Sequence, residues 1–295
     1  VPSRFSGTRP LLNGVPDTNP ATANGGLRQV NAARAGVGTF SAFNFNPFNV
    51  FQVPFERYNI YAQANYEVSD AVEVYTRGLV SKNTVNTIVA PSGSFGGTVP
   101  INLNNPFLPA TLRNQFCAFD VNSSAAIYTP RFTQAEWDAA ALATGPTDPR
   151  YRVLGVPIAD TNGDGAITAA DNPPITLNRR AVENGPRISD YQASVFDYRV
   201  GARGPITDTI DWELTGAYGE SEQVQVIKNY TLQSRFRQGT LVDLVGGVPT
   251  CTDTSNACVP VDIFSTAGYS AAAADFLNEN SSTTIRTSLS HARAG

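Results

Sequence analysis

The sequence predicts an all-β fold of long antiparallel strands. Three observations lead to this prediction: two hairpins with polar and apolar alternation, the length of their strands, and the contrast between short turns and long connections. Because successive side chains of a strand point to opposite faces, such alternation indicates strands with one apolar and one polar face.

The first predicted hairpin covers residues 57–82. From Arg57 to Val68 the even positions hold Tyr, Ile, Ala, Ala, Tyr and Val, and most odd positions hold polar residues. After a turn at residues 69–71 a similar alternation continues to Lys82. Each strand thus alternates over about ten residues, whereas strands of globular proteins usually have about 5–6.

Two interpretations of this hairpin compete, a soluble β-sandwich and an outer-membrane β-barrel. Tyr58 and Tyr66 share a face eight positions apart. At roughly 3.4 Å per residue and a tilt of about 40° they are on the order of 20 Å apart along the membrane normal. This distance is close to the height of a lipid-facing band between two aromatic girdles, so it favours the barrel.

A second hairpin is predicted at residues 187–233, and a partial strand at 283–295. The alternation covers Phe196 to Arg203, passes a turn at residues 204–209 and returns at Trp212. The remaining segments lack sustained alternation and are expected to be extracellular loop regions at residues 1–56, 83–186 and 234–282. A disordered leader is the alternative for the first of them.

Short turns alternating with long loops favour a segment of an antiparallel transmembrane β-barrel, with short periplasmic turns and long extracellular loops. Long loops without structure count against a compact soluble domain. A short surface helix is expected from Thr133 to Leu142, because Thr133 and Glu136 form a capping box.

The composition excludes several classes of protein. The chain has 295 residues, a formal net charge of −4 and 16% charged residues, so it is not a polybasic nucleic-acid binder. It has no apolar run of 18 residues, as a membrane-spanning helix requires. The chain begins with Val1 rather than Met, which predicts a processed chain or a part of a longer one.

Residues 44–62, NFNPFNVFQVPFERYNIYA, resemble the barrel region of TonB-dependent outer-membrane receptors, as do the runs YEVSD at 66–70 and VYTRG at 74–78. The turn at residues 204–212 is similar to periplasmic turns of that family. The specific similarity covers about residues 44–82 and 195–225.

The resemblance implies a 22-stranded barrel with a plug domain in its lumen. It implies uptake of a scarce nutrient, without chemistry on the substrate, across the outer membrane of a Gram-negative bacterium. The partners implied are lipid, TonB, the plug and a small-molecule ligand.

Several features of the family are missing here: a TonB box, a plug and a terminal aromatic residue. About five strands also cannot close a barrel, so we expect a segment of a larger receptor. The side chains expected to face the lumen are Arg57, Glu67, Glu73, Arg77, Asp197, Arg199 and Arg203.

The sharpest motif is DTNGDGAITAAD at residues 160–171, which matches a calcium-binding loop of the EF-hand type. Calcium prefers oxygen ligands, and Gly165 stands where such loops turn sharply. Asp171 replaces the usual Glu, and no amphipathic helix precedes the loop, so a turn without metal is the alternative. The expected structural Ca²⁺ ligands are Asp160, Asn162, Asp164, the Ala166 carbonyl, Thr168 and Asp171.

The three cysteines predict one local disulfide. Cys251 and Cys258 are separated by six residues and are expected to close a small loop in an oxidising compartment. Metal binding is the alternative, but His291 is the only histidine, so no credible zinc set exists. Cys117 is left as a buried free thiol or as the partner of a group outside this chain.

Catalysis finds little support, so we expect no enzyme. His291 has no evident Ser or Asp framework, and Glu220 and Glu222 are interpreted as a solvated strand edge rather than as glycosidase carboxylates. The aromatic residues Phe43, Phe45, Phe48 and Phe51 would either stack on a sugar or aromatic ligand or pack a loop onto the barrel.

The alternative function is a secreted or surface-attached β-rich module stabilised by calcium, such as an adhesin or S-layer piece.

Overall fold

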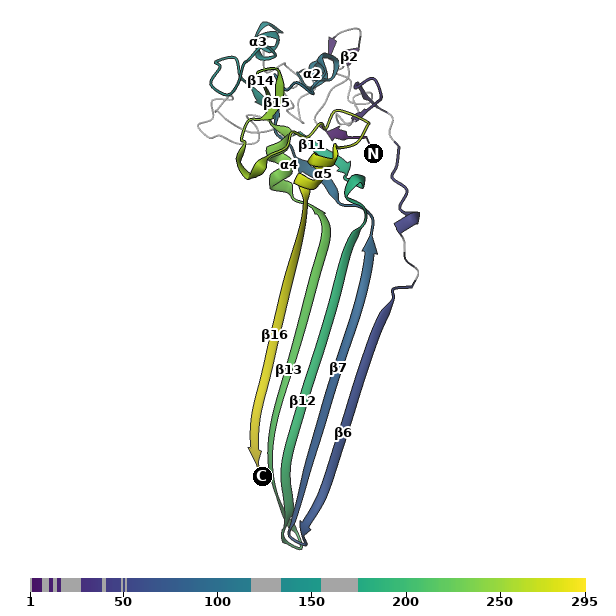
Figure 1. The fold of residues 1–295 in the computed structure, drawn as a ribbon, viewed down its shortest axis with the longest axis vertical. Helices are drawn as coiled ribbons and strands as arrows, with labels where there is room; N and C mark the ends of the chain where they lie inside the picture. Colours follow the sequence, from purple (N-terminus) through teal and green to yellow (C-terminus); the bar gives the residue numbers. More distant parts are fainter. Residues whose placement is uncertain are drawn as a thin grey trace. The chain divides into compact units, whose positions relative to one another are not determined.

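The computed structural model divides the chain into two compact units (Figure 1). The strand unit comprises residues 48–89, 187–228 and 280–295, and the packed unit comprises residues 1–47, 90–186 and 229–279. The structure describes residues 2–6, 11–12, 15–16, 28–38, 41–48, 50, 52–117, 134–154 and 175–295.

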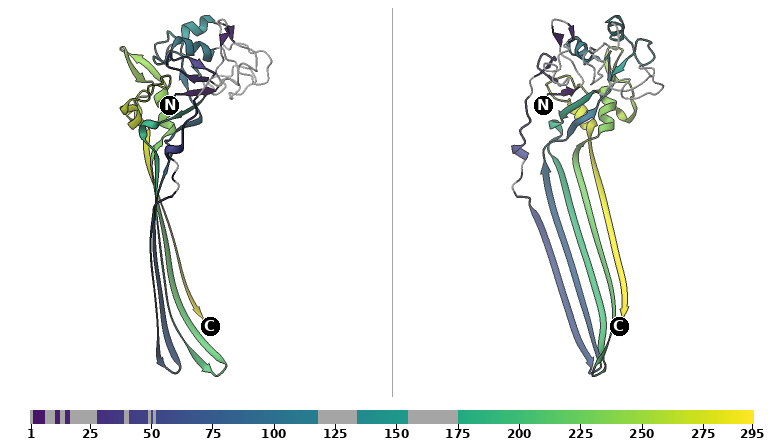
Figure 2. Two further views of the ribbon diagram at one scale, coloured as in Figure 1. Left: turned by 90° about the vertical axis from the view of Figure 1, so that its right-hand side faces the viewer. Right: turned by 180° about the vertical axis from the view of Figure 1, so that it is seen from behind.

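The strand unit is one antiparallel sheet of five long strands. In space their order is β16, β13, β12, β7, β6, and Figures 1 and 2 show them side by side. They have 15 to 22 residues each, which confirms the prediction of unusually long strands. Their bounds are β6 Phe55–Ser69, β7 Val72–Val89, β12 Arg187–Thr207, β13 Ile210–Thr231 and β16 Asn278–Ala294.

Both predicted hairpins are present, and both have very short turns. Residues 70–71 connect β6 to β7, and residues 208–209 connect β12 to β13. The pairing continues beyond the predicted limit at Lys82, because Thr87 pairs with Ser189 and Val89 with Arg187. Backbone hydrogen bonds therefore extend the strands into residues whose side chains no longer alternate clearly.

The packed unit is built around a second antiparallel sheet, whose strands follow the order β5, β4, β1, β11, β8. Short helices and small two-stranded sheets complete the described part of the unit. The sheet strands are β1 Arg4–Ser6, β4 Arg28–Val30, β5 Gly36–Val37, β8 Gly93–Thr98 and β11 Thr176–Arg180. The described helices are α2 Ala110–Cys117, α3 Gln134–Ala140, α4 Gln233–Thr240 and α5 Ala271–Leu277. The strands of the two-stranded sheets are β2 Leu11–Leu12 with β3 Val15–Pro16, β9 Ile101–Asn102 with β10 Val153–Leu154, and β14 Val242–Val245 with β15 Val248–Cys251. Described 3₁₀ turns lie at η2 Asn46–Phe48, η3 Val182–Asn184 and η4 Ser255–Ala257.

An aromatic cluster lies at the centre of the packed unit. The ring of Phe5 is 5.2 Å from that of Phe116 and 5.8 Å from that of Phe264, and all three are fully buried. These residues come from the three segments that the sequence predicts as separate loop regions. The described parts of those segments instead pack on one another around a common apolar core.

Helix α3 confirms the helix predicted near residues 133–142, although Thr133 of the expected capping box lies outside the described residues. The helix lies at the surface as expected, with Glu136 and Asp138 exposed, and its other side buries Trp137 and Ala140 in the core. Among the described helices, none has the length and apolar character needed to cross a membrane.

A buried polar network holds the β14–β15 hairpin in the packed unit. The Asn102 side chain donates to the Val242 carbonyl at 2.6 Å, and its oxygen accepts from the Val242 amide at 3.2 Å. The Asp243 carboxylate accepts from Asn104 and from Thr252, both at 2.7 Å. Because buried polar groups are costly without partners, these bonds fix the position of the hairpin base.

We predict that Phe264→Ala lowers the free energy of unfolding of the packed unit by about 3–5 kcal/mol, because it leaves a cavity beside Phe5 and Phe116. Denaturant unfolding followed by near-UV circular dichroism measures the change. Leu142→Ala, at a side chain that is 68% exposed, is the control and should cost less than about 0.5 kcal/mol. Equal costs for the two variants would contradict the proposed core.

Candidate functional site: a sheet with two different faces

Strand pairing aligns the apolar side chains of four strands on one face of the strand unit. Directly paired residues of an antiparallel sheet have their side chains on the same face, so the register defines this apolar face row by row. Its rows are Ile60 with Val80, Phe196 and the charged Glu220; Ala62 with Gly78, Tyr198 and Tyr218; Ala64 with Thr76, Val200 and Gly216; and Tyr66 with Val74, Ala202 and Leu214.

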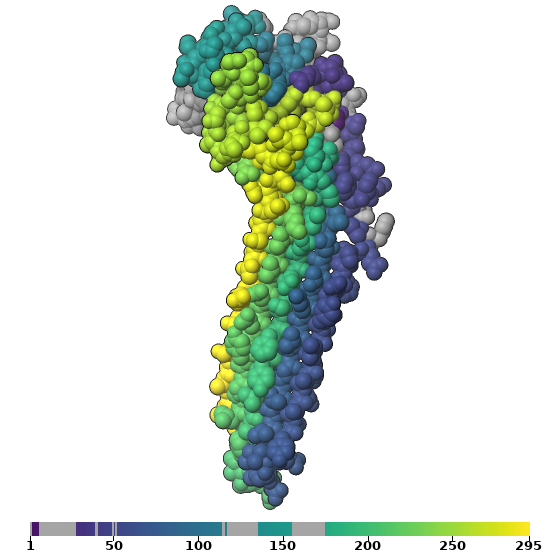
Figure 3. Space-filling model, in the orientation of Figure 1, coloured from purple at the N-terminus to yellow at the C-terminus, as the bar shows by residue number. Residues whose placement is uncertain are grey.

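The apolar face is exposed. Fractional exposure ranges from 38% at Val74 to 70% at Tyr66. All buried apolar residues of the described chain belong to the packed unit instead. Figure 3 shows one face of the sheet, on which side chains of neighbouring strands form a continuous surface. The long strands therefore do not form the interior of a compact body.

The apolar face has a limited height. From Phe196 to Gly204 it extends over eight residue steps, about 27 Å along the strand at roughly 3.4 Å per residue. The row of Phe196 also holds Glu220, and the next row holds Lys82, Ser194 and Glu222. Arg286 of β16 contacts both carboxylates, so the face is charged at this limit.

Aromatic residues lie near both limits of this band. Tyr58 pairs with Lys82 in the charged row. Phe196 lies in the neighbouring row, on the side of the turns. At the other limit, near the turns, Tyr66 pairs with Val74, and Trp212 pairs with Gly204. This distribution matches the two aromatic girdles of a lipid-facing band.

The opposite, polar face carries hydrogen bonds and ion pairs between strands. Arg77 is 3.3 Å from Asp197, and the Ser81 hydroxyl donates to Asn59 at 2.6 Å. Tyr75 donates to Glu213 at 2.6 Å. All seven residues predicted to face a lumen lie at odd positions of paired strands and share this face: Arg57, Glu67, Glu73, Arg77, Asp197, Arg199 and Arg203.

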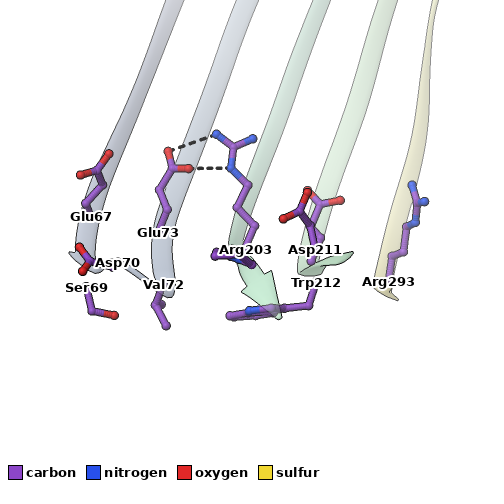
Figure 4. A pocket seen from close by; sticks show the side chains of 13 residues that line it. Glu67, Ser69, Asp70, Val72, Glu73, Arg203, Asp211, Trp212 and Arg293 are labelled. Carbon is purple, nitrogen blue, oxygen red and sulfur yellow. Dashed lines mark hydrogen bonds and ion pairs between the residues drawn. The ribbon is translucent and has the colours of Figure 1, made fainter. Parts of the chain in front are cut away.

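A cavity of about 780 Å³ lies on the polar face beside the turns (Figure 4). Arg203 Nε donates to Glu73 Oε2 at 2.7 Å, and Nη2 donates to Oε1 at 3.1 Å, so the two side chains form a bidentate pair between β7 and β12. The lining is predominantly acidic and comprises Glu67, Ser69, Asp70, Val72, Glu73, Arg203, Gly204, Pro205, Asp211, Trp212, Glu213, Arg293 and Gly295.

Gly201 leaves room for an aromatic ring of the neighbouring strand. A Cβ at Gly201 would lie 2.4 Å from the Tyr75 ring and 2.8 Å from the Leu214 carbonyl oxygen. At Gly78, in contrast, a Cβ would lie 3.8 Å from the Tyr198 ring, which is an ordinary contact distance.

The predicted disulfide between Cys251 and Cys258 is present, with an S–S distance of 2.12 Å. The Cys117 side chain and the whole calcium-type motif at residues 160–171 lie outside the described residues. Within the part of the chain that is described, no three His, Cys, Asp or Glu side chains gather as a metal site would require.

The residues considered for catalysis do not form a catalytic pair. Arg286 contacts Glu220 at 3.5 Å and also contacts Glu222, so both carboxylates share one cation between β13 and β16. His291 lies on the exposed strand β16. The interpretation of Glu220 and Glu222 as a solvated edge needs correction, because β13 pairs with strands on both sides and the two half-buried carboxylates contact Arg286.

Among the ionisable groups of the packed unit, Asp148 and Tyr269 have the largest pKa shifts. Hydrogen bonds from the Arg150 side chain hold the pKa of the Asp148 carboxyl well below its usual range, and the Arg150 and Thr144 amides add to this. Burial raises the pKa of the Tyr269 hydroxyl, which stays protonated at neutral pH. Neither group belongs to a cluster with the geometry of a catalytic site.

One feature of the packed unit was not predicted from the sequence. The rings of Phe43, Phe45 and Phe95 surround the guanidinium of Arg180. The predicted aromatic cluster included Phe43 and Phe45, but Phe95 and Arg180 are remote in sequence and only the fold brings them together.

Comparison with family models, with curated proteins and with solved structures found no match for this chain.

We predict that Gly201→Ala destabilises the strand unit by about 1–3 kcal/mol, because the added methyl group collides with Tyr75 and with the backbone of β13. Gly216→Ala is the matched control, since nothing lies within 4 Å of a Cβ there. Thermal unfolding in detergent micelles, followed by the β-sheet signal in circular dichroism, compares the two variants. Similar melting temperatures would show that the Tyr75 ring does not occupy this position.

Proposed function

We propose that this chain is a segment of a TonB-dependent transporter in the outer membrane of a Gram-negative bacterium. The transporter takes up a scarce nutrient, such as iron-loaded siderophore, cobalamin or oligosaccharide, without chemistry on the substrate. One observation carries the proposal: a sheet of strands 15 to 22 residues long exposes a continuous apolar face that is bounded by aromatic residues.

The two faces of the sheet support this proposal because each suits a different surrounding medium. Water disfavours a contiguous apolar surface of this extent, whereas the hydrocarbon core of a membrane accepts it. The polar face, with its ion pairs, suits a hydrated lumen or a plug domain. In the described sheet β6 and β16 each pair on one side only, and further strands of the receptor would pair with these edges.

The packed unit fits the extracellular part of such a transporter. The strand turns have only a few residues, whereas the opposite strand ends connect to the long segments that form the packed unit. The Cys251–Cys258 disulfide suits an oxidising compartment outside the cytoplasm. Ligand specificity would then belong to this unit, because external loops carry the function of such barrels.

The second candidate is a secreted or surface-attached β-rich binding module. It is favoured by the packed unit, which has its own core and disulfide as independent extracellular domains do. Extraction separates the two candidates. The transporter segment requires detergent, whereas the surface module is released by washing or by calcium chelation.

We expect a period-two pattern when single cysteines, in a variant without native cysteines, are spin-labelled along residues 196–203 in lipid vesicles. Labels at even positions such as Tyr198 and Val200 should be accessible to oxygen dissolved in lipid. Labels at odd positions such as Asp197 and Arg199 should be accessible to a water-soluble nickel complex. Equal accessibility of both sets would contradict the membrane assignment, as would a chain that stays soluble without detergent.

We also propose that residues 160–171 bind a structural Ca²⁺ through the oxygen ligands named above. With calcium, the melting temperature should rise by several degrees over that in chelator, because a ligand that binds only the folded state stabilises it. Asp160→Asn combined with Asp164→Asn should abolish the increase. Asp138→Asn, on helix α3, is the control and should keep it. An equal increase in both variants would exclude this loop as the site.

A further inference from the structure

Two arginines face each other in the middle of the polar face of the strand unit. Arg77 of β7 pairs directly with Arg199 of β12, so both side chains lie on the same face. The Cβ atoms of directly paired residues are about 4.5–5.5 Å apart, and like charges in such positions destabilise a sheet. Gln63 of β6 and Ala217 of β13 complete the row. On these four strands the row therefore carries two positive charges and no negative one.

The two adjacent rows supply one carboxylate, that of Asp197. Arg77 Nη2 lies 3.3 Å from Asp197 Oδ1. Two guanidinium groups thus share one carboxylate on these strands. The remaining residues of the adjacent rows are uncharged: Tyr61, Leu79 and Gly219 in one row, and Asn65, Tyr75, Gly201 and Thr215 in the other.

Arg199 is the cation that is left without a counter-charge. Among the described residues its side chain forms no ion pair, and its Nε is buried without a hydrogen-bond partner. Arg203 lies further along the same strand and face, and in contrast it forms a bidentate pair with Glu73. Because a buried donor without a partner is costly, the position of Arg199 suits an acceptor that comes from a bound ligand.

The third polar side chain of the row adds further donors. The Tyr61 hydroxyl donates to Gln63 Oε1, so this oxygen is already occupied, whereas the Gln63 amide nitrogen carries two N–H groups. The row thus presents N–H donors from Gln63, Arg77 and Arg199 on three neighbouring strands. Because the strands pair over their whole length, these donors are held in place before a ligand arrives, which lowers the entropic cost of binding.

An oxyanion satisfies this set of groups better than other ligands do. A guanidinium binds carboxylate and phosphate through paired, charge-assisted hydrogen bonds. The oxygen atoms of one such group can accept from both arginines, and its negative charge offsets their repulsion. A neutral ligand would leave the two positive charges opposed, and a metal cation would be repelled by them.

We propose that the row formed by Gln63, Arg77 and Arg199 binds an oxyanion group, a phosphate or a carboxylate, of a small-molecule ligand that moves along the polar face. The inference rests on the proposed function and deepens it by assigning an anionic substrate to the transporter. It favours an anionic nutrient over a neutral oligosaccharide.

The test is titration of the full chain with inorganic phosphate in non-ionic detergent micelles at low ionic strength, followed by phosphorus nuclear magnetic resonance. Arg199→Gln should weaken phosphate binding at least about tenfold, because one of the two charged forks is lost. Arg57→Gln is the matched control. Arg57 lies on the same face but opposite Asn83 rather than a second arginine, so binding should stay unchanged.

Thermal unfolding of the same variants separates a binding role of Arg199 from a structural one. Without phosphate, Arg199→Gln should melt at the same temperature as the unmodified chain or higher, because the repulsion from Arg77 is removed. Phosphate should raise the melting temperature of the unmodified chain and of Arg57→Gln but not that of Arg199→Gln, since a ligand stabilises only the state that it binds.

Three results would overturn the inference. They are absence of phosphate binding to the folded chain, an equal loss of binding in Arg57→Gln and Arg199→Gln, and a lower melting temperature of Arg199→Gln in the absence of phosphate. Each would leave the spin-label pattern, and with it the membrane assignment, untouched. Failure of that pattern would instead remove the transporter and leave only the binding of phosphate to be explained.

Discussion

The strand unit depends on one constraint, the period-two geometry of strand pairing maintained across four neighbouring strands. A slip of one residue between β7 and β12 would place Arg77 opposite Tyr198, or Arg199 opposite Gly78, and would mix the two faces along the whole strand. The observed register keeps Val80 with Phe196 and Val74 with Ala202. Every difference between the faces in polarity, ion pairing and exposure follows from this register.

The packed unit obeys a different constraint, because its three segments are far apart in the chain. Each must lose conformational entropy before contacts with the others can stabilise it. Burial of Phe5, Phe116 and Phe264 in one cluster offsets part of this cost. The disulfide from Cys251 to Cys258 and the buried amide network around Asn102 restrict the region further. Long connections between strands are thereby converted into a structure with its own core.

The proposed function joins these two constraints. A sheet with one apolar and one polar face suits the boundary between lipid and a hydrated interior, and chemistry at its surface is not required. In this proposal recognition would belong to the packed unit, where the rings of Phe43, Phe45 and Phe95 surround the Arg180 guanidinium. Rigid scaffolds commonly carry their binding residues on connecting segments.

The sequence alone determined the long strands, their turns, their two faces and the disulfide, because each is a local property, whereas the short strands of the packed unit were predicted as loops. Alternation from Tyr58 to Val68 and the six-residue spacing of the cysteines can be recognised without any knowledge of distant contacts. Only the tertiary structure decided that the supposed loops share a core and that Arg180 meets Phe95. Those contacts join residues that no periodicity relates, and burial of dispersed apolar side chains, rather than local propensity, brings them together.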